Sequence, residues 1–349
     1  MEDNMKFGVI VSDKRAEVHE HEIFSIKASE VLVQNKACNI CTTNYQQWLG
    51  LRHHQPTPMA FGHENSGIIV EVGSEVQDFK VGDHVVINIY QPCLECSNCR
   101  KGKNSLLCEK ISIFMKKDKY GYYGFYGCGQ YQVAQSKHVF KVSKNLLFEE
   151  AGFCEPLATV LHGIHRLKIQ VGERILVIGV GTMGLLNAQA ARCFGADVIV
   201  SEISKKKLKA VKNLGFKKII NPTKDNYVEK IKEYTNGKGL DAIIIAVGAS
   251  RAYDQALEVV SKECRILIFA AGYPIPKWNL DPNSVHYNLW EIIGTYGCST
   301  ADYQEASELL GSKTINVTPL IEDRLTLRDI QKAFEKAASP NSYRVSVIV

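Results

Sequence analysis

The sequence predicts an α/β protein in which a β-rich domain is joined to a doubly wound parallel sheet. Short alternating runs such as residues 30–34 and 66–72, bounded by glycine and asparagine, indicate strands of a barrel-like domain. From about residue 158, buried-strand runs alternate with helical stretches, which is typical of a parallel sheet covered by helices. A chain of 349 residues also exceeds what one hydrophobic core usually serves, so two domains are expected.

The second region contains the repeated strand and helix pattern of βαβ units. Its buried-strand runs lie at 174–178, 197–200, 242–247 and 265–270. Helical stretches at 185–194 and 204–214 separate them. Near the end of the chain, residues 327–338 are predicted to be helical and residues 344–349 to form a final strand.

Composition and charge exclude several classes of protein. Hydrophobic residues make up 45% of the chain and charged residues 23%, which is ordinary globular composition. A net charge of +5 with dispersed lysines gives no indication of nucleic-acid binding. The acidic N-terminus is unlike a signal peptide, and no stretch approaches the roughly 20 apolar residues of a membrane helix. A cytoplasmic enzyme is therefore expected, with its eleven cysteines as metal ligands or free thiols.

A glycine-rich loop follows the first strand of the second region. Gly179, Gly181 and Gly184 form a GxGxxG motif between a predicted strand and a predicted helix. Gly179 permits the tight turn, Gly181 lets the backbone approach a pyrophosphate, and Gly184 allows close packing of helix on strand. The N–H groups of the first helical turn, at Thr182 and Met183, would face the phosphates. The loop therefore predicts a dinucleotide site.

Glu202 ends the next strand, 18 residues after the last glycine. A carboxylate at this spacing accepts hydrogen bonds from the adenosine ribose hydroxyls and would repel a 2′-phosphate. NAD is therefore expected rather than NADP, although the cluster at 205–207 would favour a phosphate. Lys207 and Val247 complete the candidate cofactor-binding residues.

Four cysteines lie within 16 residues, with two overlapping CxxC steps. They are Cys93, Cys96, Cys99 and Cys108. Four thiolates at this spacing fit a closed tetrahedral zinc site, which is structural because no position is open to a substrate.

A second set of candidate ligands is scattered along the chain. Cys41 lies in the segment 36–44, which holds two cysteines, His63 and Glu64 lie between glycines, and Glu155 precedes a proline. Each alone is a weak signal, because single histidines and cysteines are more often structural. Only their combination is informative.

In combination, these motifs make the chain similar to the zinc-containing medium-chain dehydrogenases, in particular the polyol (sorbitol-type) and threonine dehydrogenase branch. The likeness covers nearly the whole chain, and the motifs occur in the family's order. They are the Cys-x-[Ser/Thr] loop at 41–43, GHExxG at 62–67, residues 71–74 with 79–83, the cysteine lobe, residues 155–158 and the glycine-rich loop.

The resemblance implies a domain organisation. Residues 1–157 and 295–349 would form a GroES-like catalytic domain that carries the structural zinc lobe at 93–108. Residues 158–294 would form a Rossmann NAD-binding domain. The family's members are homodimers or homotetramers.

The resemblance also implies site residues. Catalytic zinc would be held by Cys41 and His63, with Glu64 and Glu155 as close carboxylates, either of which could ligate directly. Thr43 would hydrogen-bond the substrate oxygen. Zinc as a Lewis acid and NAD as hydride acceptor would then supply the chemistry, with two zinc ions bound to each chain.

The expected reaction is hydride transfer between NAD(H) and a secondary alcohol or ketone of a polyol, sugar alcohol or cyclitol. An amino alcohol such as L-threonine is the nearest alternative substrate. A zinc- and NAD-binding regulatory protein with little catalysis is an alternative of a different class. A metal-free quinone-reductase-like member is disfavoured, because such proteins generally lack the cysteine lobe and the Cys41–His63 pair.

The chain departs from the family at three places. Asn44 stands where members usually carry an aspartate that supports the zinc histidine, and Gln46 where many carry a proton-relaying histidine. The step from Cys99 to Cys108 is one residue longer than usual. Four aromatic residues could line a substrate pocket or belong to the core: Tyr45, Trp48, Phe114 and Trp290.

Overall fold

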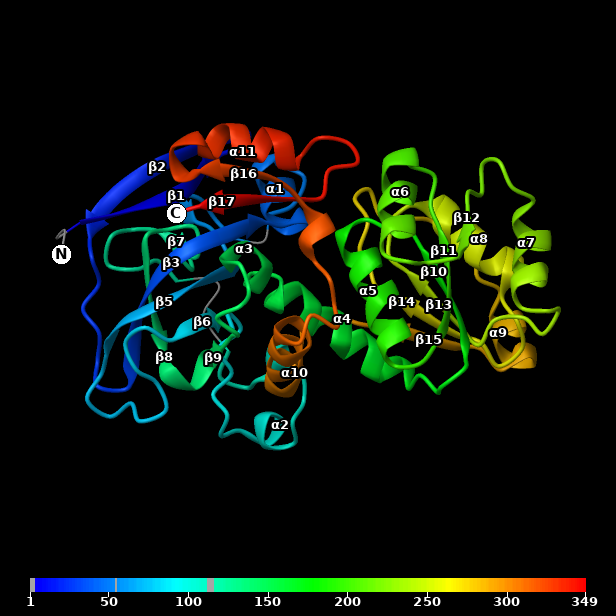
Figure 1. The fold of residues 1–349 in the computed structure, drawn as a ribbon, viewed down its shortest axis with the longest axis horizontal. Helices are drawn as coiled ribbons and strands as arrows, with labels where there is room; N and C mark the ends of the chain where they lie inside the picture. The colour runs from blue at the N-terminus through cyan, green and yellow to red at the C-terminus, as the bar shows by residue number, and fades with distance from the viewer. Residues whose placement is uncertain (1–3, 54, 112–115) are drawn as a thin grey trace. The chain divides into compact units, whose positions relative to one another are not determined.

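The computed structural model describes residues 4–53, 55–111 and 116–349. The chain divides into two compact units (Figure 1). The first comprises the chain up to Ala158 together with Cys298–Val349, and the second comprises Thr159–Gly297. Phe114, one of the candidate pocket residues, lies outside the described part of the chain. No helix in the described ranges is long and apolar enough to cross a membrane.

The first unit is built on a seven-stranded sheet in which β3 occupies the centre. β3 (Glu30–Ile40) pairs antiparallel with β5 (Glu64–Val72), β8 (Tyr131–Gln135) and β17 (Arg344–Ile348). The remaining strands are β16 (Ile321–Thr326) beside β17, then β6 (His84–Ile87) and β9 (Val139–Lys141) beside β5. The pairing of β17 with β3 brings the end of the chain beside residues near position 40.

A smaller sheet and short helices complete this unit. The sheet runs in the order β2 (Arg15–Glu22), β1 (Asn4–Ser12), β4 (Met59–Ala60) and β7 (Tyr123–Gly124). The helices include α1 (Thr42–Trp48), α2 (Ser97–Arg100), α3 (Phe148–Ala151), α10 (Thr300–Gly311) and α11 (Ile330–Ala337). α4 (Cys154–Leu167) begins in this unit and continues into the second.

Two of the candidate pocket aromatics belong to the core of the first unit. Trp48 is buried and stacks on Phe334 of α11, with 5.6 Å between the ring centroids. Tyr45 packs against the same hydrophobic cluster. These contacts support the alternative that assigned both residues to the core.

The second unit contains a six-stranded parallel sheet in the order β12-β11-β10-β13-β14-β15. The strands are β10 (Arg174–Ile178), β11 (Asp197–Ser201), β12 (Lys218–Ile220), β13 (Ala242–Ile245), β14 (Arg265–Ile268) and β15 (Glu291–Gly294). The helices are α5 (Thr182–Cys193), α6 (Lys205–Asn213), α7 (Tyr227–Tyr234), α8 (Ser250–Val259) and α9 (Pro282–Asn288).

The four predicted strands of this sheet and the helices between them are confirmed, and so is the α/β fold class. The interior strands β10 and β13 are almost entirely buried, because helices cover both faces of a parallel sheet. Trp290, the last candidate pocket residue, packs against the hydrophobic core of this unit.

Candidate active site and metal centres

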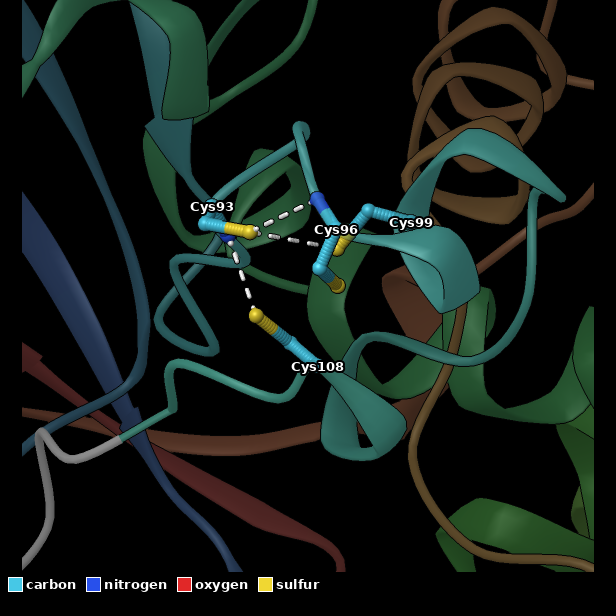
Figure 2. A group of neighbouring side chains, drawn as sticks. All are labelled: Cys93, Cys96, Cys99 and Cys108. Atoms are coloured by element: carbon cyan, nitrogen blue, oxygen red, sulfur yellow. Dashed lines mark hydrogen bonds between the residues drawn. The ribbon is translucent and has the colours of Figure 1, made fainter.

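The cysteine lobe contains the short helix α2, and its four cysteine side chains lie close together (Figure 2). The sulfur atoms of Cys93, Cys96, Cys99 and Cys108 all lie within 4.8 Å of one another. Cys93 and Cys99 are separated by 3.9 Å between their sulfurs. A tetrahedral zinc site with Zn–S bonds of ~2.3 Å requires sulfurs about 3.8 Å apart, so this donor set fits the metal.

The lobe also prepares one of its thiols for ionisation. The backbone amides of Glu95 and Cys96 donate to the Cys93 sulfur at 3.4 and 3.3 Å, and they lower the pKa of Cys93 to about 6. The Cys93 amide in turn donates to the Cys108 sulfur at 3.2 Å. A cysteine binds a metal ion as its thiolate. Amides that stabilise the Cys93 thiolate therefore favour metal binding by the lobe.

The second metal-binding group lies where β3 leads into α1 and where β5 begins. Cys41 is the N-terminal cap of α1 and is 3% exposed. Its sulfur lies 3.0 Å from Nε2 of His63. Cys41, His63 and Glu64 place their ligand atoms within 4.8 Å of one another. A zinc-bound sulfur and imidazole nitrogen are about 3.6 Å apart, so a shift of roughly half an ångström would admit the ion.

Glu64 is held by a partner that the sequence did not reveal. Arg344, at the start of β17, donates from Nε and a terminal nitrogen to the two Glu64 oxygens at 2.8 and 2.7 Å. Glu64 is 1% exposed and Arg344 5% exposed, so the ion pair is buried. The geometry is bidentate, which is the strong form of such a pair.

Glu155, at the start of α4, approaches the group without being within 4.8 Å of all three members. The Tyr90 hydroxyl donates to a Glu155 oxygen at 3.2 Å. Burial raises the pKa of Glu155 to about 7, while His63 lowers it and Glu64 raises it. Glu155 is therefore a buried carboxyl whose charge interacts with Cys41, His63 and Glu64.

The remaining predicted residues of this site lie on α1. The Thr43 hydroxyl accepts a hydrogen bond of 3.3 Å from Arg52, a second residue that sequence reasoning missed. Asn44 is 3% exposed and contacts the Cys41 sulfur. Gln46 is half-buried on the same helix.

The glycine-rich loop has the close contacts that its three glycines suggested. Gly179 has a φ of +85°, and a Cβ there would lie 2.9 Å from the Val247 side chain. A Cβ on Gly184 would lie 1.9 Å from the Gly179 carbonyl oxygen, whereas one on Gly181 would meet nothing nearer than Lys207 Nζ at 3.8 Å. Gly179 is therefore required by its positive φ and by the Val247 side chain, and Gly184 by the backbone of Gly179. Gly181 has open space around it except for Lys207.

Glu202 is buried and folds back onto the loop. One of its oxygens accepts the Val180 amide at 2.9 Å, and the other accepts the Ile203 and Ser204 amides at 2.8 Å each. A carboxylate offers about four acceptor positions, so one remains for a ligand hydroxyl. The structure thus brings Gly181, Glu202 and Lys207 into one neighbourhood.

Two family models match this chain and together span more than two thirds of it. Residues 27–144 match the alcohol dehydrogenase GroES-like domain, and residues 182–312 match the zinc-binding dehydrogenase model. The chain belongs to the zinc-containing alcohol dehydrogenase superfamily.

Similar members of this superfamily extend over almost the full length. Sorbitol dehydrogenase of Bacillus subtilis is 29% identical, covering 99% of this chain and 97% of the relative. L-threonine 3-dehydrogenase of Escherichia fergusonii is 26% identical, covering 91% of each chain. A zinc-binding dehydrogenase from Sinorhizobium meliloti, solved with bound NADP, superposes with a TM-score of 0.88 at 25% identity and covers 100% of both chains.

The superfamily resemblance pointed to the residues that converge in these two groups, but not to the partners that hold them. Arg344 lies 280 residues from Glu64, and the pairing of both β17 and β5 with β3 brings them together. A charged residue at the start of an otherwise apolar strand was the one signal available in the sequence.

Proposed function

We propose that this alcohol dehydrogenase superfamily member is a zinc-dependent, NAD-linked enzyme. Its substrate would be a secondary alcohol or ketone of a polyol, sugar alcohol or cyclitol. The observation that carries the proposal is the convergence of the buried Cys41 and Glu64 with the half-buried His63, together with the charge interactions of the buried Glu155 with all three. The similarity to sorbitol dehydrogenase supports the polyol class.

Within this proposal, Cys41, His63 and Glu155 hold a catalytic zinc ion. Glu64 is assigned to the bidentate pair with Arg344, which already balances its charge, and Glu155 is assigned as the carboxylate ligand. A zinc ion at this position acts as a Lewis acid that polarises the substrate oxygen. Thr43, two residues after Cys41, orients that oxygen by hydrogen bonding, and Arg52 fixes the Thr43 hydroxyl.

The two metal centres are expected to be separate, with one catalytic and one structural zinc per chain. Metal content of protein purified without chelator tests this for the wild type, Cys41→Ser and Cys96→Ser. We expect two zinc ions in the wild type and about one in Cys41→Ser, which stays folded but loses turnover. Cys96→Ser should mainly lose stability or assembly. Full activity in Cys41→Ser would contradict the assignment of the catalytic site.

The cofactor is proposed to be NAD, bound at the glycine-rich loop by Gly179, Gly181, Thr182, Met183, Gly184, Glu202, Lys207 and Val247. A 2′-phosphate beside the buried Glu202 carboxylate would meet like charge. Glu202→Ala is expected to relax the preference for NAD over NADP, measured as the ratio of kcat/KM values. The Sinorhizobium relative with bound NADP makes this comparison necessary. Equal use of both cofactors by the wild type would refute the role of Glu202.

A second candidate substrate is a threonine-like amino alcohol, supported by the similarity to L-threonine 3-dehydrogenase. NAD reduction measured against a panel of polyols, cyclitols and L-threonine separates the two substrate classes. A protein that binds zinc and NAD but reduces no cofactor across the panel would favour the regulatory alternative.

A further inference from the structure

Asn44 contacts the sulfur of Cys41 with both its backbone and its side chain. Its backbone amide donates to Cys41 Sγ at 3.4 Å, and the thiol donates to Asn44 Oδ1 at 3.3 Å. Asn44 is 3% exposed, so water does not compete for these contacts. The buried amide is therefore directed at the sulfur ligand.

His63 has no comparable support in the described part of the chain. Its Nε2 contacts Cys41 Sγ at 3.0 Å, and the ring makes no other hydrogen bond there. Metal-binding histidines usually donate their second ring N–H to a carboxylate or carbonyl, which orients the ring. In this site the buried polar side chain, Asn44, contacts Cys41 and not His63.

The chemistry of the amide suits a thiolate as well as a thiol. A metal-bound thiolate accepts hydrogen bonds and donates none. Rotation of the Asn44 amide by half a turn exchanges Oδ1 for Nδ2, which can then donate to the sulfur. An aspartate in this position only accepts when ionised, and it would add negative charge beside Cys41 and Glu64.

We propose that Asn44 is a positioning residue that stabilises metal binding by donating its side-chain amide to the Cys41 thiolate. The inference rests on the proposed zinc site at Cys41 and His63. It reverses the expectation from the family resemblance, in which asparagine at this position is a weakened partner of the histidine. If the family expectation held, Asn44→Asp would tighten zinc binding. If Asn44 donates to the Cys41 thiolate, the same substitution weakens zinc binding.

The test is a zinc titration of metal-free protein against a chromophoric chelator. The proteins compared are the wild type, Asn44→Ala, Asn44→Asp and Gln46→Glu. Zinc affinity at the Cys41 site should fall by about 10-fold in Asn44→Ala and further in Asn44→Asp, within the range for lost supporting contacts. Gln46→Glu places the same added charge on the same helix and should change the affinity by less than about twofold if the amide donor is the cause. The cysteine lobe serves as an internal reference, because its zinc affinity should not change.

A spectroscopic readout separates amide donation from a general structural effect. With cobalt(II) in place of zinc, loss of the N–H···S bond should move the thiolate-to-cobalt absorption of Asn44→Ala to lower energy. The band of Gln46→Glu should stay in place.

Two results would overturn the proposed role of Asn44 while leaving the proposed function intact. One is a wild type that binds two zinc ions and an Asn44→Asp variant that binds them as tightly or more tightly. The other is a Gln46→Glu variant that weakens zinc binding as much as Asn44→Asp does. A wild type that binds only one zinc ion would overturn the proposed function as well.

Discussion

At the scale of single residues, the buried Arg344–Glu64 pair makes a sharp prediction about stability. Burial alone would lower the pKa of Arg344, but the Glu64 charge outweighs it and raises that pKa. Removing one partner leaves the other charge buried without compensation, which costs about 3–5 kcal/mol. Arg344→Met should therefore lower the free energy of unfolding by about that amount, measured by urea denaturation at fixed zinc concentration.

The double variant Glu64→Gln, Arg344→Met provides the control for this prediction. It removes both charges, so most of the lost stability should return. A single Arg344→Met variant as stable as the wild type would show that the ion pair has no net role in folding.

At the scale of elements, the strand–loop–helix unit from β10 to α5 predicts different outcomes for two glycines of one motif. A Cβ on Gly184 would lie 1.9 Å from the Gly179 carbonyl oxygen, so Gly184→Ala must separate α5 from the loop. We expect a loss of at least about 2 kcal/mol in unfolding free energy. The contacted atom is a backbone oxygen, which cannot move away by a change of rotamer as a side chain can. Thermal and urea unfolding would measure it.

Gly181→Ala is the matched variant, because its Cβ would meet only Lys207 Nζ at 3.8 Å. It should fold with near wild-type stability and instead weaken NADH binding, since a Cβ there keeps the backbone from the pyrophosphate. NADH fluorescence titration measures this effect. Equal stability loss in the two alanine variants would refute the distinction.

The same elements explain what could be predicted from the sequence. The glycine-rich loop and the cysteine lobe are contiguous in the chain, so the spacing of their residues alone was enough to predict a chemistry for each. The predicted strand runs of the second unit are mostly apolar, with charged or polar residues only at their ends, which indicated both their position and their burial. Arg344 and Tyr90 could not be found in this way, because folding brings them to carboxylates that lie 280 and 65 residues away in the chain. Arg52 lies only nine residues from Thr43, but its contact depends on how the loop after α1 folds back. The direction of the Asn44 side chain likewise depends on the local turn at Cys41.

At the scale of the whole molecule, the edge of the second unit's sheet favours assembly. β15 ends the sheet, with β14 on one side, and three of its four residues are exposed. Large apolar side chains are exposed on β15 and within a few residues of it in the chain: Tyr287, Leu289, Ile292 and Tyr296. An edge strand flanked by exposed apolar groups is a template for pairing with another strand. We therefore expect a homodimer, or a homotetramer built from such dimers, that pairs β15 with its copy.

Ile292→Lys tests this assembly, because a charge buried at the strand pair would oppose association. Sedimentation velocity should give two or four times the 39.0 kDa chain mass for the wild type and a smaller species for the variant. Val171→Lys is the matched control, since Val171 is an 89% exposed apolar residue of the same unit, away from β15 in the sheet order. It should assemble like the wild type. A monomeric wild type, or dissociation of both variants alike, would exclude β15 as the interface and leave its exposed apolar residues without a partner.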